Sequence, residues 1–228
     1  MRHFPYKHPT FGTRNRPKPE SAWKCSVYYW WWEYLRRNVE YQIASKSTDK
    51  GRFAALFEDF GVLGDDFKTW WSERGVHLFA EPPAEETVRV LEQGEIVPNG
   101  TLTITFPLNL PKKHLEKRFK ELLMKEHQGK RGRQMAKLSQ ARYRFKGQPN
   151  LHAIELGLRV YDHRMKNPDM PLWQLGNTLE GFQAGNKILK TDTPASVTNK
   201  KNILAATVCR YIKRVERNIQ NTGEGMFL

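Results

Sequence analysis

The pattern of apolar and polar positions predicts a mostly helical chain. Apolar residues recur at spacings of three, four and seven, the period of one face of a helix. Stretches with this period lie at 21–45, 52–60, 67–74, 112–127, 150–166, 170–179 and about 196–221. Proline and glycine separate several of them, as expected between helices.

Three shorter stretches alternate between apolar and polar residues, which indicates strands. They lie at 76–81, 87–92 and 102–106, and Pro98-Asn99-Gly100 forms a turn signal before the last one. We expect a small antiparallel sheet covered by a helix, because a lone hairpin is only marginally stable. The predicted fold class is therefore α+β, mostly helical, with N-terminal helices beside the sheet and a helix-turn-helix-like C-terminal module.

We expect four parts along the chain. These are a basic, proline-rich arm at 1–20, an aromatic and acidic helical module with the sheet at 21–110, a basic helix and linker at 111–149, and a helical module at 150–228. The prolines of the arm disfavour a helix. Such an arm either follows phosphates or a minor groove of DNA, or is a disordered terminus.

The run from Tyr28 to Trp32 contains only aromatic residues. One apolar stripe cannot hold five consecutive rings, so some of them must lie on another face of the helix. They could belong to the core, to a subunit interface or to a base-stacking surface. We predict a homodimer in which Tyr28, Tyr29, Trp30 and Trp32 form the interface.

Charge is segregated along the chain of 228 residues, whose formal net charge is +14. Residues 51–110 carry four basic and ten acidic side chains, whereas residues 111–228 carry twenty-four basic and ten acidic ones. This segregation favours a polyanionic partner for the basic half. The alternative is a dipolar protein whose acidic part docks on its own basic part.

The densest positive charge lies at 111–149, with thirteen basic and three acidic residues. Lysine and arginine side chains that meet phosphates release counterions, which gives affinity for nucleic acid of any sequence. The candidate contacts in this part are Lys112, Lys113 and Lys117 on the helix and Lys130, Arg131 and Arg133 in the loop that follows.

The last three helices, with a short one in the middle, have the order of a helix-turn-helix domain, whose third helix reads bases with its first turns. The candidate contacts are Asn199, Lys200, Lys201 and Asn202, followed by Arg210 and Arg214. A loop of roughly 17 residues before the third helix departs from the usual three or four. A plain helical bundle with a cationic face is therefore the alternative.

The segment from Ser26 to Asn38, together with Tyr41, resembles the N-terminal domain of proteobacterial proteins described as transcriptional regulator-like. The segments 107–118 and 204–213 are similar to proteins encoded on bacterial mobile elements. This resemblance implies a DNA-associated role on such an element. It transfers no catalytic residue to this chain.

Several functional classes lack their sequence signals. No apolar run is long enough to span a membrane, no secretory signal is recognisable at the first residues, and two cysteines exclude a disulfide framework. Phosphate-loop, nucleophile-elbow and zinc-protease motifs are missing. A metal-dependent nuclease assembled from Asp59, Asp65, Glu81 and Glu92 remains an alternative, because two or three carboxylates suffice.

We therefore predict a cytoplasmic, nucleoid-associated bacterial protein that binds double-stranded DNA without catalysis, metal or cofactor, as a regulator or accessory factor of a mobile element. An RNA-binding protein would use the same basic residues with aromatic stacking. A third possibility is a protein-interaction factor or inhibitor that acts on a nucleic-acid machine, in defence or counter-defence.

Overall fold

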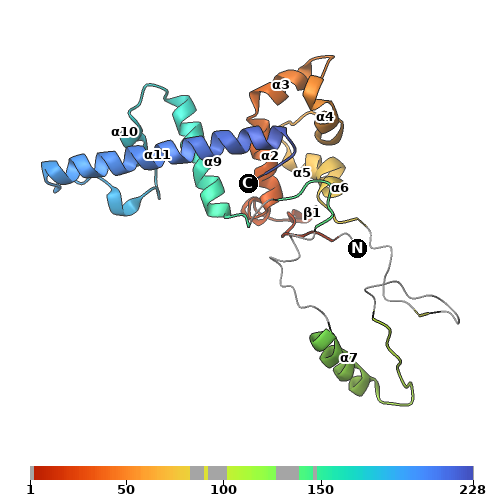
Figure 1. Ribbon diagram of the computed structural model, residues 1–228. Coiled ribbons are helices and arrows are strands. Elements are labelled where there is room, and N and C mark those ends of the chain that lie inside the picture. Colours follow the sequence, from red (N-terminus) through yellow and green to blue (C-terminus); the bar gives the residue numbers. More distant parts are fainter. Residues whose placement is uncertain (1–2, 83–89, 92–101, 127–138, 146–147, 228) are drawn as a thin grey trace.

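The computed structural model describes residues 3–82, 90–91, 102–126, 139–145 and 148–227 (Figure 1). It is mostly helical with one small antiparallel sheet, so the predicted fold class is confirmed. The short elements before α7 are α1 (Ser21–Lys24), η1 (Gly51–Phe53), α4 (Ala54–Phe60), α5 (Phe67–Trp70), η2 (Trp71–Gly75) and α6 (Val76–Leu78).

The predicted helix over 21–45 is divided into α1, α2 (Val27–Arg36) and α3 (Val39–Lys46). The break after α2 is stabilised by Asn38, whose side-chain oxygen accepts a hydrogen bond of 2.9 Å from the backbone N–H of Tyr41. Its amide nitrogen donates to the carbonyl of Ile219 at 2.9 Å. One buried side chain thus caps α3 and joins it to the last helix.

The helix α2 runs through the core of the chain, which explains its aromatic run. Eight of its ten residues are buried, on every face. Tyr28, Tyr29, Trp30 and Trp32 all lie in this core, so the prediction that they form a dimer interface is wrong. Their rings are covered by other parts of the same chain, including Phe67, Phe79 and Phe145.

The sheet is not where the alternating pattern predicted it. It consists of β1 (Gly12–Thr13) and β2 (Arg16–Pro17), a hairpin within the N-terminal arm. The predicted strand at 76–81 begins instead as α6, because the helical backbone continues from α5 through the π-helix η2. A π-helix has hydrogen bonds from i to i+5 in place of i to i+4. Trp70, Trp71 and Leu78, in and beside η2, are all buried in the core.

The other two predicted strands are not present where the structure describes them. Residues 102–106 form no strand, and Leu102 and Phe106 are exposed. Only residues 90–91 of the strand predicted at 87–92 are described, and they are also irregular. The predicted turn at 98–100 lies outside the described residues.

The three C-terminal helices follow the predicted order. They are α9 (Leu151–Lys166), the short α10 (Leu172–Thr178) and the long α11 (Pro194–Gly223). The segment before α11 contains the short helix η3 (Ala184–Asn186), and its Phe182 is buried against Tyr211. This loop is therefore packed on α11 and is not a tight turn.

One hydrophobic core crosses the boundary between the predicted modules. Ile154 and Leu158 of α9 and Val215 and Ile219 of α11 belong to the same buried cluster as the aromatic side chains of α2. Figure 1 shows α11 extending across α9 to reach α2. The N-terminal helices therefore support the C-terminal half of α11 directly.

The helix α7 (Lys112–Glu126) lies outside this core. None of its side chains is buried, and Figure 1 shows it apart from the other helices. Its Phe119 ring packs only edge-to-face on Phe106, with ring centroids 5.8 Å apart. Across the described residues, no helix combines the length and apolar character needed to span a membrane.

Candidate nucleic-acid interface

The long helix α11 has one exposed face that is mostly polar. The N-terminus of the helix is capped by Thr193, whose side chain accepts a hydrogen bond from the backbone N–H of Ser196. Pro194 occupies the first turn, where proline is favourable. Residues spaced by three or four then share one exposed face. They are Asn199, Asn202, Ala206, Arg210, Lys213, Arg214, Arg217 and Gln220.

The second half of this face is cationic. Arg210, Lys213, Arg214 and Arg217 are exposed, and no carboxylate of the described residues forms an ion pair with them. Arg210 only donates a hydrogen bond to the Thr207 hydroxyl at 3.1 Å. From Asn199 to Arg217 the row extends about 27 Å, at a rise of 1.5 Å per residue.

The two predicted lysines at the start of α11 have other partners. Lys200 Nζ lies 2.8 Å from both carboxylate oxygens of Asp192 and donates to the carbonyl of Lys187 at 3.0 Å. Lys201 lies over the Trp173 ring, 4.4 Å from its centroid. These contacts connect the preceding loop and α10 to α11. Of the four residues predicted as contacts in the first turns, only Asn199 and Asn202 are exposed.

The contact with Lys200 also affects the pKa of Asp192. Its pKa is lowered, first by the hydrogen bond from the backbone N–H of Leu189 and then by the hydrogen bond from Lys200. Each of these interactions favours the charged carboxylate. The charge of Lys200 is therefore balanced within the protein.

On α7 the predicted contacts Lys112, Lys113 and Lys117 are exposed. Lys112 lies 3.8 Å from Glu116, a distance typical of a weak, solvated pair. The predicted loop contacts Lys130, Arg131 and Arg133 lie outside the described residues. The structure thus brings the lysines of α7 together on one helix, separate from the face of α11.

The predicted nuclease carboxylates do not form a cluster. Asp59 accepts a hydrogen bond from Tyr143 at 2.5 Å and forms an ion pair with Arg142 at 2.9 Å. Asp65 pairs with Arg36, and Glu81 accepts from the backbone of Gln140. Glu92 lies outside the described residues, and within them no group of three histidine, cysteine or acidic side chains is placed to hold a metal ion.

The hydrogen bond between Tyr143 and Asp59 is partly buried. Burial, followed by the hydrogen bond to Asp59, raises the pKa of the Tyr143 hydroxyl above its usual value. The phenol therefore stays protonated and donates to the carboxylate. Its position favours a role in holding the segment 139–145 on α4.

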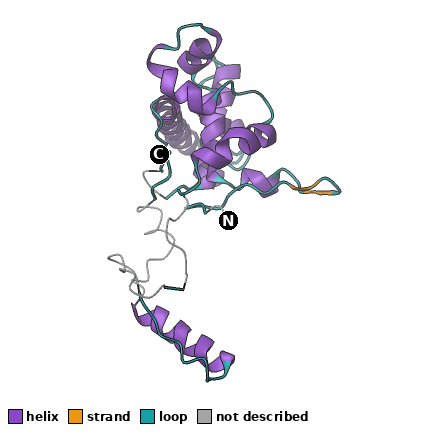
Figure 2. Cartoon of the chain, turned by 90° about the vertical axis from the view of Figure 1, so that its right-hand side faces the viewer, coloured by secondary structure: helices purple, strands orange, loops and turns teal. Residues whose placement is uncertain are grey.

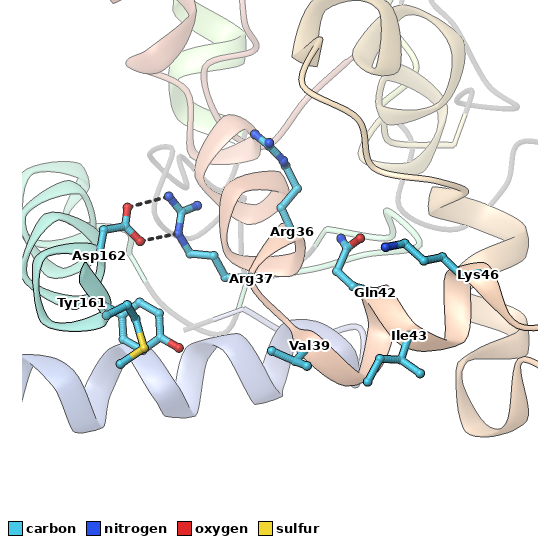
Figure 3. Close-up of a pocket in the computed structure, with 9 residues that line it drawn as sticks. Arg36, Arg37, Val39, Gln42, Ile43, Lys46, Tyr161 and Asp162 are labelled. Carbon is cyan, nitrogen blue, oxygen red and sulfur yellow. Dashed lines mark hydrogen bonds and ion pairs between the residues drawn. The ribbon is translucent and has the colours of Figure 1, made fainter. Parts of the chain in front are cut away.

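A pocket opens between α2, α3 and α9, with a volume of about 530 Å³ (Figure 3). At one end Arg37 donates to both carboxylate oxygens of Asp162, at 2.8 and 2.7 Å. Burial alone would lower the pKa of Arg37, but its hydrogen bonds to Asp162 and Glu33 raise it. This end of the pocket joins α2 to α9.

The rest of the pocket lining combines exposed apolar side chains with Gln42 and the cations Arg36 and Lys46. Val39, Ile43 and Met165 are 67%, 65% and 54% exposed. Lys46 lies beside them on α3 and forms no ion pair with a described carboxylate (Figure 3). Sequence analysis did not identify this site, because its residues come from three helices and share no local motif.

Sequence analysis also selected only part of the cationic row on α11. It named Arg210 and Arg214, whereas Lys213 and Arg217 lie on the same exposed face. The spacing of three and four between positions 210, 213 and 217 is the signal that finds them.

No protein-family model, curated protein sequence or solved structure matches this chain. The resemblance to regulator-like proteins of mobile elements therefore stays a prediction from sequence.

Proposed function

We propose that this protein binds double-stranded DNA through the cationic row of α11, without catalysing a reaction. The observation that carries this proposal is the exposure of Arg210, Lys213, Arg214 and Arg217 on one helix face with no ion-pair partner among the described carboxylates. Four such cations on a straight helix suit a row of phosphates. Asn199 and Asn202 extend the same face with amide groups that can read adenine edges.

The fold supports a fixed contact of this kind. Val215 and Ile219, on the opposite side of α11, are buried in the same core as α2. The cationic second half of the helix is therefore held in place, and binding costs little ordering of its backbone. The lysines of α7 provide a second cationic surface for the same polyanion.

The biological role remains part of the proposal. The segments 26–38, 107–118 and 204–213 resemble regulator-like and mobile-element proteins. This resemblance supports a regulator or accessory factor of a bacterial mobile element that acts in the cytoplasm near the nucleoid. We retain a homodimer as a proposal too, since paired readers suit two half-sites. The dimer interface must differ from the aromatic run at 28–32, because that run is buried in the core. Sedimentation at tens of micromolar protein tests whether the protein is a dimer.

The test is equilibrium binding to random duplex DNA between about 50 and 300 mM salt, the range in which phosphate contacts are resolved. We expect K213A/R217A to weaken binding roughly tenfold and to reduce the slope of log K against log salt by about 1.8, or about 0.9 per phosphate contact. The matched control K68A/K166A removes two exposed charges from other helices.

Three results would overturn the proposal. They are the absence of binding by the intact protein, equal losses in both double variants, and tighter binding to structured RNA than to duplex DNA. The last result would support the RNA-binding alternative. Cleavage of the duplex in the presence of magnesium would contradict a role without catalysis.

The pocket of Figure 3 favours a second candidate function, docking of a protein segment that pairs an aliphatic side chain with a carboxylate. Val39, Ile43 and Met165 offer the apolar contact, and Lys46 offers the complementary charge. Peptides of the form Glu-x-x-Leu, titrated against intact protein and against I43D, test it. Binding that is the same in both proteins would exclude the pocket.

A further inference from the structure

The N-terminal arm, which the sequence predicts either to follow phosphates or a minor groove or to be a disordered terminus, carries a further cationic element. Residues 1–19 contain no acidic side chain. Within them, Gly12–Thr13 and Arg16–Pro17 pair as an antiparallel hairpin with Arg14 and Asn15 at its tip. Figure 2 shows this hairpin, in orange, projecting from the helical body.

The base of the hairpin is attached to the core. The Phe11 ring packs against Trp23 and Phe67, with centroids 6.1 and 6.0 Å away. The backbone N–H of Lys18 donates to the carbonyl of Phe11 at 2.9 Å, which closes the hairpin at its base. The segment before it is also held, since Phe4 packs on Tyr28 and Trp71.

The bend of the hairpin depends on Gly12. This residue has a φ of +79°, and a Cβ placed on it would lie 2.3 Å from the carbonyl oxygen of Arg16 and 2.8 Å from the backbone nitrogen of Lys18. Only glycine tolerates this close approach and this backbone conformation. At the tip, the Thr13 hydroxyl accepts a hydrogen bond from the backbone N–H of Arg16 at 3.2 Å.

The two arginines of the hairpin are available for a ligand. Arg14 and Arg16 are exposed, and among the described residues neither forms an ion pair. A disordered basic tail would lose conformational entropy on binding. A hairpin that is already closed and anchored presents both guanidinium groups without that cost.

From this arrangement we infer that the hairpin 12–17 is a preformed contact for the phosphate backbone of duplex DNA, in which Arg14 and Arg16 each bind a phosphate. Guanidinium groups bind phosphate with two parallel hydrogen bonds. The inference rests on the proposed function, and it adds a second, separate contact to the row on α11. Two contacts fixed to one core suit a duplex, because a duplex is itself stiff over this length.

The test uses the full chain and a random duplex, with the same salt titration. We expect R14A/R16A to weaken binding about tenfold and to lower the salt slope by about 1.8, again about 0.9 per phosphate. The charge control is K68A/K166A. Tryptophan fluorescence and circular dichroism verify that each variant keeps the aromatic core.

A second pair of variants separates shape from charge. G12A keeps every cation but disrupts the hairpin, and we expect it to weaken binding at least threefold. G64A is the matched control, because nothing lies within 4 Å of a Cβ at Gly64. Unchanged affinity in G12A, with a loss in R14A/R16A, would mean that the arm acts only as a charged tail and would overturn the inference.

The outcomes also distinguish this inference from the proposed function. If the intact protein binds duplex DNA and R14A/R16A binds equally well, the hairpin has no part in binding while the role of α11 stands. If the intact protein does not bind duplex DNA, both fail together. Loss in R14A/R16A beyond that of K68A/K166A, accompanied by loss in G12A, supports the hairpin contact.

Discussion

The Glu81 carboxylate accepts a hydrogen bond of 2.8 Å from the backbone N–H of Gln140, fifty-nine positions further along the chain. The neighbouring backbone is held as well, since the N–H of Glu81 donates to the carbonyl of His3 at 2.8 Å. Glu81 and Gln140, on either side of the segment that contains α7, therefore lie side by side. The described residues between them, 90–91 and 102–126 with α7, lie outside both buried clusters and form an excursion from the core.

This geometry predicts that the excursion can be removed. Between positions 82 and 138, none of the residues that the structure describes belongs to either buried cluster. Replacing residues 84–137 with a short glycine-serine linker should therefore change the melting temperature by only a few degrees. Loop-closure entropy changes slowly with loop length. Thermal denaturation followed by circular dichroism measures this.

The same deletion also tests the role of α7. We expect duplex binding to weaken, because the lysines at 112, 113 and 117 are lost, while binding that depends on Lys213 and Arg217 persists. A deletion variant that no longer shows the cooperative unfolding of the parent would contradict an independent core. Affinity equal to that of the intact protein would remove α7 from the interface.

The junction between the N-terminal helices and α11 depends on Asn38. We expect N38A to destabilise the fold by about 2–3 kcal/mol, because it removes a helix cap and leaves the carbonyl of Ile219 without its donor. N150A is the matched control. Asn150 caps α9 at an exposed site with one hydrogen bond to the N–H of Ala153, and its loss should cost about 1 kcal/mol.

Urea unfolding of both variants distinguishes these effects. Equal costs for N38A and N150A would mean that the contact with Ile219 adds nothing. N38D refines the test, since aspartate keeps the cap but places a carboxylate against a carbonyl. It should therefore be closer in stability to N38A than to the parent protein.

The ion pair between Arg37 and Asp162 should couple the two halves of the chain. A double-mutant cycle with R37A and D162A should give an interaction free energy of about 1 kcal/mol, since both side chains are partly exposed. R37A alone should cost more than D162A alone. The reason is that R37A also removes the ion pair of 2.5 Å between Arg37 and Glu33, whose side chain is only 12% exposed.

Equal costs of R37A and D162A would show that Glu33 does not depend on Arg37. An interaction energy near zero would show that the pair, although bidentate (Figure 3), is offset by desolvation. Both quantities come from urea unfolding at neutral pH.

Local periodicity predicted the long helices well. The stretches 112–127, 150–166 and about 196–221 correspond to α7, α9 and α11 within a few residues, because each has one strongly apolar face. The pattern failed at 76–81, where Leu78 and Phe79 are buried in succession. Alternation over so few residues cannot distinguish a strand from the end of a helix that contains a π-turn.

The candidate site was predicted only in part, for a tertiary reason. Arg210 and Arg214 are exposed as predicted, but Lys200 and Lys201 bind Asp192 and Trp173, which belong to other segments. The sequence shows that these lysines are charged and on a helix, and it does not show which residues fold back over them. The same limit applies to Tyr28 and Trp32, whose neighbours come from the whole chain.

The contact between Lys200 and Asp192 yields a prediction with a defined pH dependence. The pKa of Asp192 is lower in the folded protein than its ordinary value of 3.8. Its contribution to stability is therefore complete above that ordinary pKa, and is lost as the pH falls through the lower, folded pKa. We expect D192N to be less stable than the parent at pH 7, and the difference to disappear at a pH below the folded pKa.

Duplex binding should respond in the opposite direction. At neutral pH, D192N leaves the charge of Lys200 unbalanced beside Asn199 on the row of α11, so affinity should rise by a few-fold and the salt slope by about 0.9, one added phosphate contact. The double variant D192N/K200A removes the released charge and should return both values to those of the parent. If D192N and D192N/K200A instead bind equally well, the start of α11 does not face the duplex, and contact with DNA is confined to its second half.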